Sequence, residues 1–287
     1  MAKRFESKLD VALFNNLNEM FIEKNWINNI IGYDSFLEKY YVFLENLNDD
    51  ERDLILDLTK DYLYVAPEEY FRRLIDVSAR LSEYDLNLSN IYVLPILSKE
   101  DRQKSGKIKS GGHTSYYFKN KMLNNYEVFA ESKFHVIENL EGLPSAEKIA
   151  KKKHPIVLLD DYVGTGESAI TALDELFKVQ NYDKKFVFVL TLVSQEIGMN
   201  AVKAQGYNFL TGQIRKRGIS DKYDQAEAKV KIEIMLNLEE KIGVKERFRL
   251  GYGGSEGLVT MMRTPNNTFP AYWLEPKNKK WEPPFLR

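Results

Sequence analysis

Two adjacent carboxylates and a short glycine loop stand together near the middle of this chain. Asp160 and Asp161 follow an apolar run at residues 156–159, and two residues later comes a loop made of Gly164, Thr165, Gly166, Glu167 and Ser168. A loop that leads into a helix presents unpaired backbone N–H groups and the positive end of the helix dipole, so it attracts phosphate. Carboxylates repel phosphate and suit hydroxyl donors or a metal ion instead. A phosphorylated sugar would satisfy both halves, with its 5′-phosphate in the loop and its ribose hydroxyls on the acids.

The segments on either side of the loop are those that such a site needs. The apolar run is typical of a strand buried on both faces of a parallel sheet. After the loop a helical pattern begins, in which Ile170, Leu173, Leu176 and Phe177 recur on one face. Residues 186–193 predict the next strand, so the whole segment is a strand–helix–strand unit with a right-handed crossover.

Two other interpretations of the loop stay open. Residues 164–169 also fit the dinucleotide pattern G-x-G-x-x-G/A, in which an acid at the end of the next strand binds the ribose. Here two aspartates stand ahead of the loop, where pyrophosphate would lie, and Asp183 is at the wrong end of the next strand. A turn capped by Thr165 and Ser168 would explain the glycines but not the acids. A nucleoside-triphosphatase loop is excluded because no lysine follows the glycines.

The stretch resembles the phosphoribosyl-pyrophosphate signature of type I phosphoribosyltransferases: a hydrophobic strand, two acids, two mostly apolar residues and a five-residue phosphate loop. Asp160 and Asp161 fall on the acid pair and residues 164–168 on the loop, where Glu167 is a departure because an acid beside phosphate is unfavourable. The resemblance implies an α/β fold with a type I phosphoribosyltransferase-like parallel sheet flanked by helices. It also implies Mg²⁺ and phosphoribosyl pyrophosphate, or a related ribosyl phosphate, as ligands. The two aspartates would then hold the ribose hydroxyls or the waters of the metal ion.

A basic, glycine-bearing segment at residues 98–120 precedes the acid pair. Type I phosphoribosyltransferases usually hold pyrophosphate in such a loop, and the resemblance gives that role to Lys109, Ser110, Gly111 and Gly112, with Lys109 as a catalytic cation. A solvated charged loop explains these residues equally well. His113 is a candidate for contact with the acceptor or the leaving pyrophosphate, although a single loop histidine is more often incidental.

The C-terminal block is the second informative stretch. Glycines at residues 251–257 lead to a predicted strand at 258–262, and Asn266 and Asn267 follow shortly before a group of aromatic residues. Asparagine amides can read the polar edge of a base or an amide, so both are candidates for acceptor binding. They equally make turns and core contacts, and residue types alone do not decide between these roles.

The predicted domain organisation is a helical extension at residues 1–88 and a phosphoribosyltransferase-like domain at residues 89–287. In the extension, apolar stripes predict helices near residues 9–21, 36–44, 54–63 and 68–81. Ser35 and Glu38 have the spacing of a capping box for the second of them. Further strands are predicted at residues 91–97, 115–118, 134–137 and 207–210, and further helices at 196–204 and 221–241. The extension is expected to pack on the catalytic domain or on a partner.

Composition excludes several classes of function. The net charge of −1 offers no electrostatic case for binding nucleic acid or an anionic membrane. The chain has no cysteine, which excludes disulfides and thiolate metal sites, and its three histidines are scattered. No stretch approaches the about 18 apolar residues of a membrane span, and residues 1–10 lack a signal-peptide core. We therefore expect a cytoplasmic protein.

Four blocks together resemble the phosphoribosyltransferase-like proteins of bacterial conflict and antiphage systems, some of which accompany retron reverse transcriptases. These blocks are the helical N-terminus, KIKSGG, LLDDYVGTG and TPNNTFPAYW. The resemblance implies a defence effector or accessory protein, with a reverse transcriptase–nucleic-acid complex as partner. Two alternatives stay open: a non-catalytic subunit that senses a ligand or binds partners through its helices, and an enzyme acting on another ribosyl donor such as NAD or a nucleotide.

Overall fold

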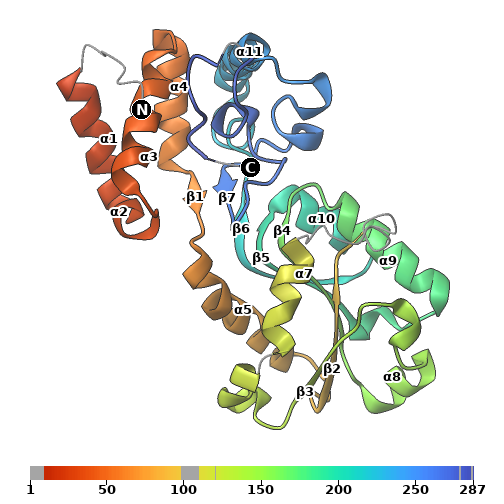
Figure 1. Ribbon diagram of the computed structural model, residues 1–287. Coiled ribbons are helices and arrows are strands. Elements are labelled where there is room, and N and C mark those ends of the chain that lie inside the picture. The colour runs from red at the N-terminus through yellow and green to blue at the C-terminus, as the bar shows by residue number, and fades with distance from the viewer. Residues whose placement is uncertain (1–9, 98–109, 120, 278, 286) are drawn as a thin grey trace. The chain divides into compact units, whose positions relative to one another are not determined.

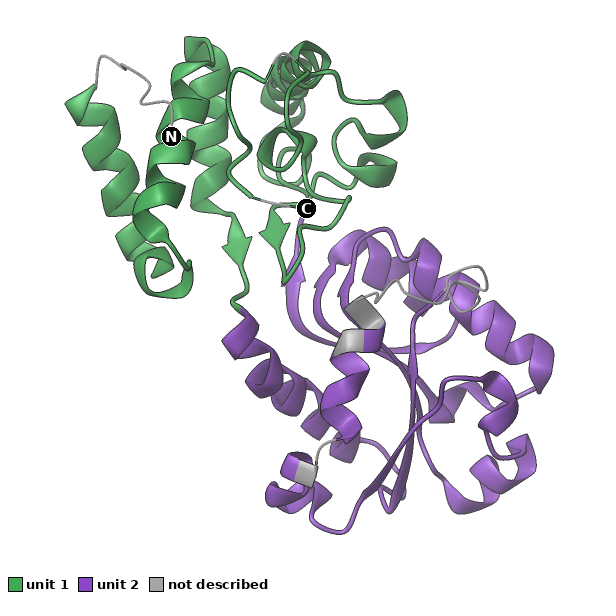
Figure 2. Cartoon of the chain, viewed as in Figure 1, with its two compact units in different colours: residues 1–66, 217–287 green, residues 67–216 purple. Residues whose placement is uncertain are grey.

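The chain folds into two compact units. The computed structural model describes residues 10–97, 110–119, 121–277, 279–285 and 287. Unit 1 comprises Met1–Ala66 and Arg217–Arg287, and unit 2 comprises Pro67–Lys216 (Figure 2). Unit 2 is therefore one continuous segment inserted into unit 1. This grouping differs from the predicted boundary at residue 88, because residues 217–287 group with the N-terminal helices and residues 67–88 group with the sheet.

Unit 2 contains a five-stranded, all-parallel sheet, which confirms the predicted α/β fold (Figure 1). Its strands lie in the order β3-β2-β4-β5-β6. Their bounds are Asn90–Pro95 for β2, Lys133–Val136 for β3, Ile156–Val163 for β4, Val187–Gln195 for β5 and Asn208–Arg215 for β6. The chain goes from β2 outward to β3 and then returns past β2 to β4. The switch point of this doubly wound sheet therefore lies between β2 and β4.

Helices cover both faces of the sheet. Residues of α8, α9 and α10 share a hydrophobic core with Ile156, Leu158 and Val189 of the sheet. The helix α5 packs against β5 and β6, and α7 packs against β2 and β4. The bounds of these helices are Tyr70–Ala79 for α5, Ser110–Tyr116 for α7, Ala146–Lys152 for α8, Glu167–Val179 for α9 and Glu196–Ala204 for α10. Burial on both sides explains the continuous apolar runs at residues 156–159 of β4 and 187–190 of β5.

Five of the six strands predicted within this unit are confirmed, and one is wrong. Residues 115–118, predicted as a strand, lie in the helix α7 and the short 3-10 helix that follows it. Pro95 is the last residue of β2, and it pairs with Leu159 of β4 beyond the point at which pairing with β3 ends, at Val93. Its missing N–H therefore interrupts no ladder with β3.

Unit 1 is mainly helical. Its helices are Val11–Glu23 (α1), Trp26–Asn29 (α2), Tyr33–Glu45 (α3), Asp49–Lys60 (α4) and Gln225–Ile242 (α11). Two short strands, Leu63–Tyr64 (β1) and Val259–Thr260 (β7), pair in parallel. One hydrophobic core joins both chain segments, with Phe21, Tyr40 and Leu58 packed together with Met235 and Tyr272. This shared core is the physical reason why residues 217–287 group with the N-terminal helices.

The capping box of unit 1 lies one helix later than predicted. Ser35 falls inside α3, which already begins at Tyr33. The capping box opens α4 instead, where Asn48 accepts a hydrogen bond from the Glu51 N–H and Glu51 accepts one from the Asn48 N–H. Among the described residues, no helix is long and apolar enough to cross a membrane.

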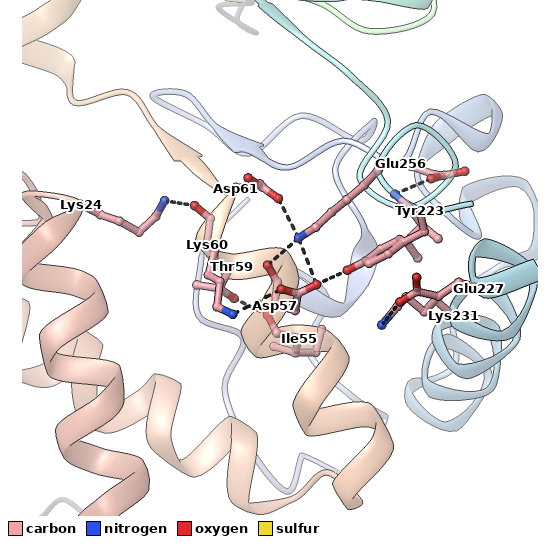
Figure 3. Close-up of polar contacts among 12 residues, drawn as sticks. Lys24, Ile55, Asp57, Thr59, Lys60, Asp61, Tyr223, Glu227, Lys231 and Glu256 are labelled. Carbon is pink, nitrogen blue, oxygen red and sulfur yellow. Dashed lines mark hydrogen bonds and ion pairs between the residues drawn. The ribbon is translucent and has the colours of Figure 1, made fainter. Parts of the chain in front are cut away.

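A cluster of charges joins the end of α4 to the segment before α11 (Figure 3). The carboxylate of Asp57 accepts a hydrogen bond from the Tyr223 hydroxyl and lies 3.0 Å from Lys222 Nζ. Lys222 also lies 2.8 Å from Asp61. Burial alone would raise the pKa of Asp57, but the hydrogen bonds from Tyr223 and Lys222 outweigh it and lower the pKa to about 2.

Replacing Asp57 by asparagine should therefore lower the free energy of unfolding of unit 1 in a pH-dependent way. The folded pKa lies below the ordinary value of 3.8, so the wild-type advantage is present above that value and is lost as the pH falls through about 2. The partly exposed carboxylate should contribute about 1 kcal/mol at neutral pH after solvent screening. Urea unfolding followed by tryptophan fluorescence measures it, because all three tryptophans lie in unit 1. A difference in the free energy of unfolding between wild type and Asp57→Asn that stayed constant down to pH 2 would contradict this account.

Candidate functional site

The two aspartates lie inside the last part of β4 rather than after it. The strand continues to Val163, so both carboxylates are attached to sheet backbone and not to a loop. The backbone N–H of Asp161 donates a hydrogen bond of 2.9 Å to Oδ1 of Asp160. The Asp160 side chain is half-buried, whereas Asp161 is only 6% exposed. The pair is therefore asymmetric, with one acid nearer to solvent and the other in the interior of unit 2.

Asp161 has a partner that the sequence did not indicate. The Tyr70 hydroxyl, at the start of α5, donates a hydrogen bond of 2.9 Å to Oδ2 of Asp161. Tyr70 is 1% exposed, so this bond lies in the interior. No local sequence pattern around residue 70 predicts this contact. Tyr70 and Asp161 are 91 residues apart and come together only because α5 packs on the sheet.

The glycine loop leads directly into α9, as predicted. Gly166 is the N-cap residue, with φ of 85°, a left-handed conformation that favours glycine. The helix N-terminus has no side-chain cap, and the N–H of Ile170 bonds back to the Gly166 carbonyl. Glu167 and Ser168, the first two residues of the helix, have exposed side chains. The first-turn N–H groups and the helix dipole thus offer a site to an anion.

A glycine from the next helix packs directly on this loop. Gly198 lies in the first turn of α10, and a Cβ at this position would be 2.1 Å from the Gly164 carbonyl oxygen and 2.9 Å from the Gly166 nitrogen. The N-terminal ends of α9 and α10 therefore meet at the loop, and neither has a side-chain cap. The sequence held a signal for this contact, because a glycine inside a helix costs about 1 kcal/mol relative to alanine and so needs a structural reason.

Hydroxyl groups gather in the sheet beside the acid pair. Thr191 of β5 is in register with Asp160, and Ser194 is in register with Val163. The hydroxyls of Thr191, Ser194 and Tyr162 are buried and have no hydrogen-bond partner among the residues that the structure describes. Burial raises the pKa of Tyr162, against a smaller opposing effect of Arg215. Buried polar groups are usually satisfied, so this group of hydroxyls marks the carboxyl end of the sheet as an unusually polar interior.

This end of the sheet is also where the topology places a ligand site. In open α/β sheets, ligands bind outside the carboxyl ends of the strands, at the switch point. Here the carboxyl end of β4, with the acid pair and the loop, lies next to the carboxyl end of β2. The described elements thus bring together Asp160, Asp161, residues 164–168, Tyr70 and Gly198.

The predicted pyrophosphate residues are only partly described. Lys109 lies outside the described residues. Ser110, Gly111 and Gly112 form the first turn of α7 and not a loop, and His113 is in the same helix. The helix is held by packing on β2 and β4, and its Thr114 and Ser115 are buried, which outweighs the loop preference of the two glycines. Binding of pyrophosphate by these residues stays a prediction.

The predicted acceptor residues Asn266 and Asn267 belong to unit 1, whereas the acid pair belongs to unit 2. Nδ2 of Asn267 donates to the Tyr252 carbonyl and to the Ser255 hydroxyl, at 3.3 and 3.2 Å. The backbone carbonyl of Asn266 accepts the N–H of Tyr252. The structure thus gives both residues a part in fixing the glycine turn at 251–257, and their role in acceptor binding stays a prediction.

The acid pair offers the type of ligand that Mg²⁺ prefers. Mg²⁺ prefers hard oxygen ligands and is usually held by one or two carboxylates together with water and substrate phosphates. Asp160 and Asp161 supply two such carboxylates. Among the described residues no group of three or more His, Cys, Asp or Glu side chains could hold a metal on its own. The residues therefore fit a Mg²⁺ ion whose other ligands would be water and substrate phosphates.

Comparison with protein families matches residues 24–287 to PRTase-CE. The chain belongs to the PRTase-CE family. It is accordingly a phosphoribosyltransferase-like protein, in agreement with the signature at residues 156–168. No curated protein matches it.

Two solved structures show a distant likeness to this PRTase-CE protein. The orotate phosphoribosyltransferase from Aeropyrum pernix is 14% identical, with a TM-score of 0.31, over 51% of this chain and 70% of that chain. A hypothetical protein from Neisseria gonorrhoeae with bound ppGpp is 13% identical, with a TM-score of 0.35, over 60% of this chain and 97% of that chain. Similarity at this level says nothing about the substrate of the present chain.

Proposed function

We propose that this PRTase-CE protein binds phosphoribosyl pyrophosphate together with Mg²⁺ and transfers its ribosyl phosphate to an acceptor. The observation that supports this most is the arrangement at the carboxyl end of β4. There, two carboxylates stand directly before an uncapped helix N-terminus, at the switch point of a parallel sheet. The carboxylates suit ribose hydroxyls and the helix N-terminus suits a 5′-phosphate, so a phosphorylated ribose is the ligand that matches both.

In this proposal the protein acts mainly by positioning and electrostatics. The backbone N–H groups of residues 164–168 and the hydroxyls of Thr165 and Ser168 anchor the 5′-phosphate. Asp160 and Asp161 accept hydrogen bonds from the 2′ and 3′ hydroxyls and so fix the ribose ring. The bond between ribose C1 and the pyrophosphate oxygen breaks through an oxocarbenium-like transition state, and the acceptor forms the new bond at C1. Two carboxylates near the ring favour the positive charge that develops there.

When bound, Mg²⁺ would act as a Lewis acid on the leaving pyrophosphate. Lys109 is the proposed cation on the pyrophosphate, with Ser110, Gly111 and Gly112 beside it. His113, Asn266 and Asn267 remain the proposed contacts of the acceptor.

Calorimetric titration of phosphoribosyl pyrophosphate into the wild-type protein tests the proposal. We expect saturable binding with Mg²⁺ present, and binding weaker by about tenfold or more when EDTA replaces it, because the carboxylates and the pyrophosphate then repel each other without a bridging cation. Ribose 5-phosphate should compete, since it retains the groups that contact the loop and the acids. Absence of binding under both conditions would overturn the proposal.

Two other outcomes correspond to the alternatives. Binding of NAD or a nucleotide in place of phosphoribosyl pyrophosphate would assign another ribosyl donor to the same site. The protein could also bind phosphoribosyl pyrophosphate and release no pyrophosphate with any of a panel of nucleoside, nucleotide and protein acceptors. That result would indicate a ligand sensor.

The proposed biological setting is bacterial antiphage defence, on the resemblance carried by KIKSGG, LLDDYVGTG and TPNNTFPAYW. The proposed partner is a reverse transcriptase–nucleic-acid complex, and the proposed compartment is the cytoplasm. A net charge of −1 gives the chain itself little attraction for nucleic acid, so the reverse transcriptase would have to provide the contact. Phage plating on bacteria that express the whole defence locus tests this setting. Protection should be lost when Asp160 and Asp161 are both replaced by asparagine.

A further inference from the structure

The hydrogen bond between Tyr70 and Asp161 joins the start of α5 to the acid pair. The donor is the Tyr70 hydroxyl, the acceptor is Oδ2 of Asp161, and the distance is 2.9 Å. Both side chains are buried, with 1% of Tyr70 and 6% of Asp161 exposed. The bond is therefore protected from competing water, which makes its contribution larger than that of a surface contact.

A buried carboxylate needs such a donor. Burial disfavours the ionised form, and a hydrogen bond donated to the carboxylate favours it. Asp160 has a different donor, because its Oδ1 accepts a hydrogen bond from the backbone N–H of Asp161. One oxygen of each acid is thus engaged by the protein itself, the first by the backbone of β4 and the second by a side chain from α5. Each contact fixes the orientation of one carboxylate.

Tyr70 is the first residue of α5, and two arginines of this segment bind to the sheet. Nη2 of Arg73 lies 2.7 Å from the Glu69 carboxylate, and Nη1 of Arg73 donates to Oε1 of Gln213 on β6, at 3.2 Å. At the other end of α5, Nη1 of Arg80 donates to the Thr211 carbonyl, also on β6, at 3.0 Å. Contacts at both ends hold α5 at a fixed position along β6, so the Tyr70 hydroxyl has little freedom to move away from Asp161.

We propose that Tyr70 is a positioning residue for the ribose-binding carboxylate: it holds Asp161 in one orientation at the site for phosphoribosyl pyrophosphate. This inference rests on the proposed function and adds to it the segment at residues 67–79, which the sequence placed in a separate helical extension. Tyr70 acts through Asp161 and not on the substrate.

Replacing Tyr70 by phenylalanine removes the hydroxyl and keeps the ring that packs in the interior. The comparison of Tyr70→Phe with wild type therefore isolates the hydrogen bond to Asp161.

The first measurement needs no ligand. The carboxyl-carbon NMR signal of Asp161, assigned with the Asp161→Asn variant, is compared at neutral pH in the wild type and in Tyr70→Phe. Loss of the donor should shift this signal, because Oδ2 then lacks the hydrogen bond that the Tyr70 hydroxyl donates. The matched control is Tyr182→Phe, which removes a hydroxyl that donates to the Pro144 carbonyl in the same unit, and it should leave the Asp161 signal unchanged. An Asp161 signal that is the same in Tyr70→Phe and wild type would overturn the inference.

The second measurement is binding of phosphoribosyl pyrophosphate with Mg²⁺. In Tyr70→Phe we expect an about tenfold higher Kd at neutral pH, because the Asp161 carboxylate is no longer held in one orientation. In an Asp161→Asn background the same change should have little further effect on the Kd, because the carboxylate that Tyr70 positions is already absent. A tenfold loss that persisted in that background would assign Tyr70 a general structural role and contradict the proposal. Failure of the wild type to bind would overturn the proposed function alone, since the NMR comparison still decides whether the Tyr70 hydroxyl holds Asp161.

Discussion

Replacing Asp160 and Asp161 together by asparagine should abolish measurable binding of phosphoribosyl pyrophosphate. Asparagine keeps the shape of aspartate but loses the charge, so it can neither attract Mg²⁺ nor accept strong hydrogen bonds from two ribose hydroxyls. A hydrogen bond to a charged group contributes about 1.5–3 kcal/mol, and loss of two predicts a Kd higher by about 100-fold or more. Calorimetric titration measures the loss directly.

The matched control removes the same amount of charge elsewhere in unit 2. Asp174 and Glu175 lie in the middle of α9, outside the acid pair and the loop, and Asp174→Asn with Glu175→Gln also removes two negative charges. This control should bind as the wild type does. The aspartate variant should stay folded, because its asparagine at position 161 can still accept the hydrogen bond from Tyr70. Binding within about threefold of wild type in the aspartate variant would mean that the acids do not contact the ligand.

The parts of unit 2 that the sequence predicted well are those with a local physical cause. A strand segment buried on both faces is usually apolar, so residues 156–159 of β4 and 187–190 of β5 are recognisable as runs of Ile, Val, Leu and Phe. The helix α10 was predicted with its observed bounds, Glu196–Ala204, because its apolar face and the strand before it are both recognisable in the sequence. The glycine loop carried its own signal, since Gly166 has the left-handed backbone that glycine favours.

The parts that were missed depend on contacts between distant segments. The α5 segment has an amphipathic pattern that fits packing on either unit. Packing on β5 and β6, together with the bond of Tyr70 to Asp161, assigns it to the sheet. Residues 110–116 have two glycines and β-favouring aromatic neighbours, and packing on β2 and β4 overrides both preferences. Residues 217–287 share a core with α1–α4, which no local pattern of either segment reveals.

Replacing Gly198 by alanine should greatly weaken binding without touching a charged group. An added Cβ would stand 2.1 Å from the Gly164 carbonyl oxygen and 2.9 Å from the Gly166 nitrogen, and both atoms belong to backbone that cannot rotate away. The loop or the start of α10 must therefore shift, which removes the N–H groups from the positions that hold the 5′-phosphate. Misplacement of about 1 Å is enough to cost about 100-fold in such a positioned site.

The sign of the stability change separates this contact from simple helix propensity. Alanine is favoured over glycine by about 1 kcal/mol in a helix, so propensity alone predicts a higher melting temperature for Gly198→Ala. The backbone clash predicts a lower one, together with loss of binding. Gly142→Ala is the matched control in the same unit, because its Cβ would meet only the Ile137 side chain, at 3.7 Å, and it should change neither property. A Gly198→Ala protein that melted at a higher temperature and still bound phosphoribosyl pyrophosphate would show that α10 does not hold the loop. The expected outcome, a lower melting temperature with binding lost, would make the meeting of the α9 and α10 N-termini a requirement of the phosphate site.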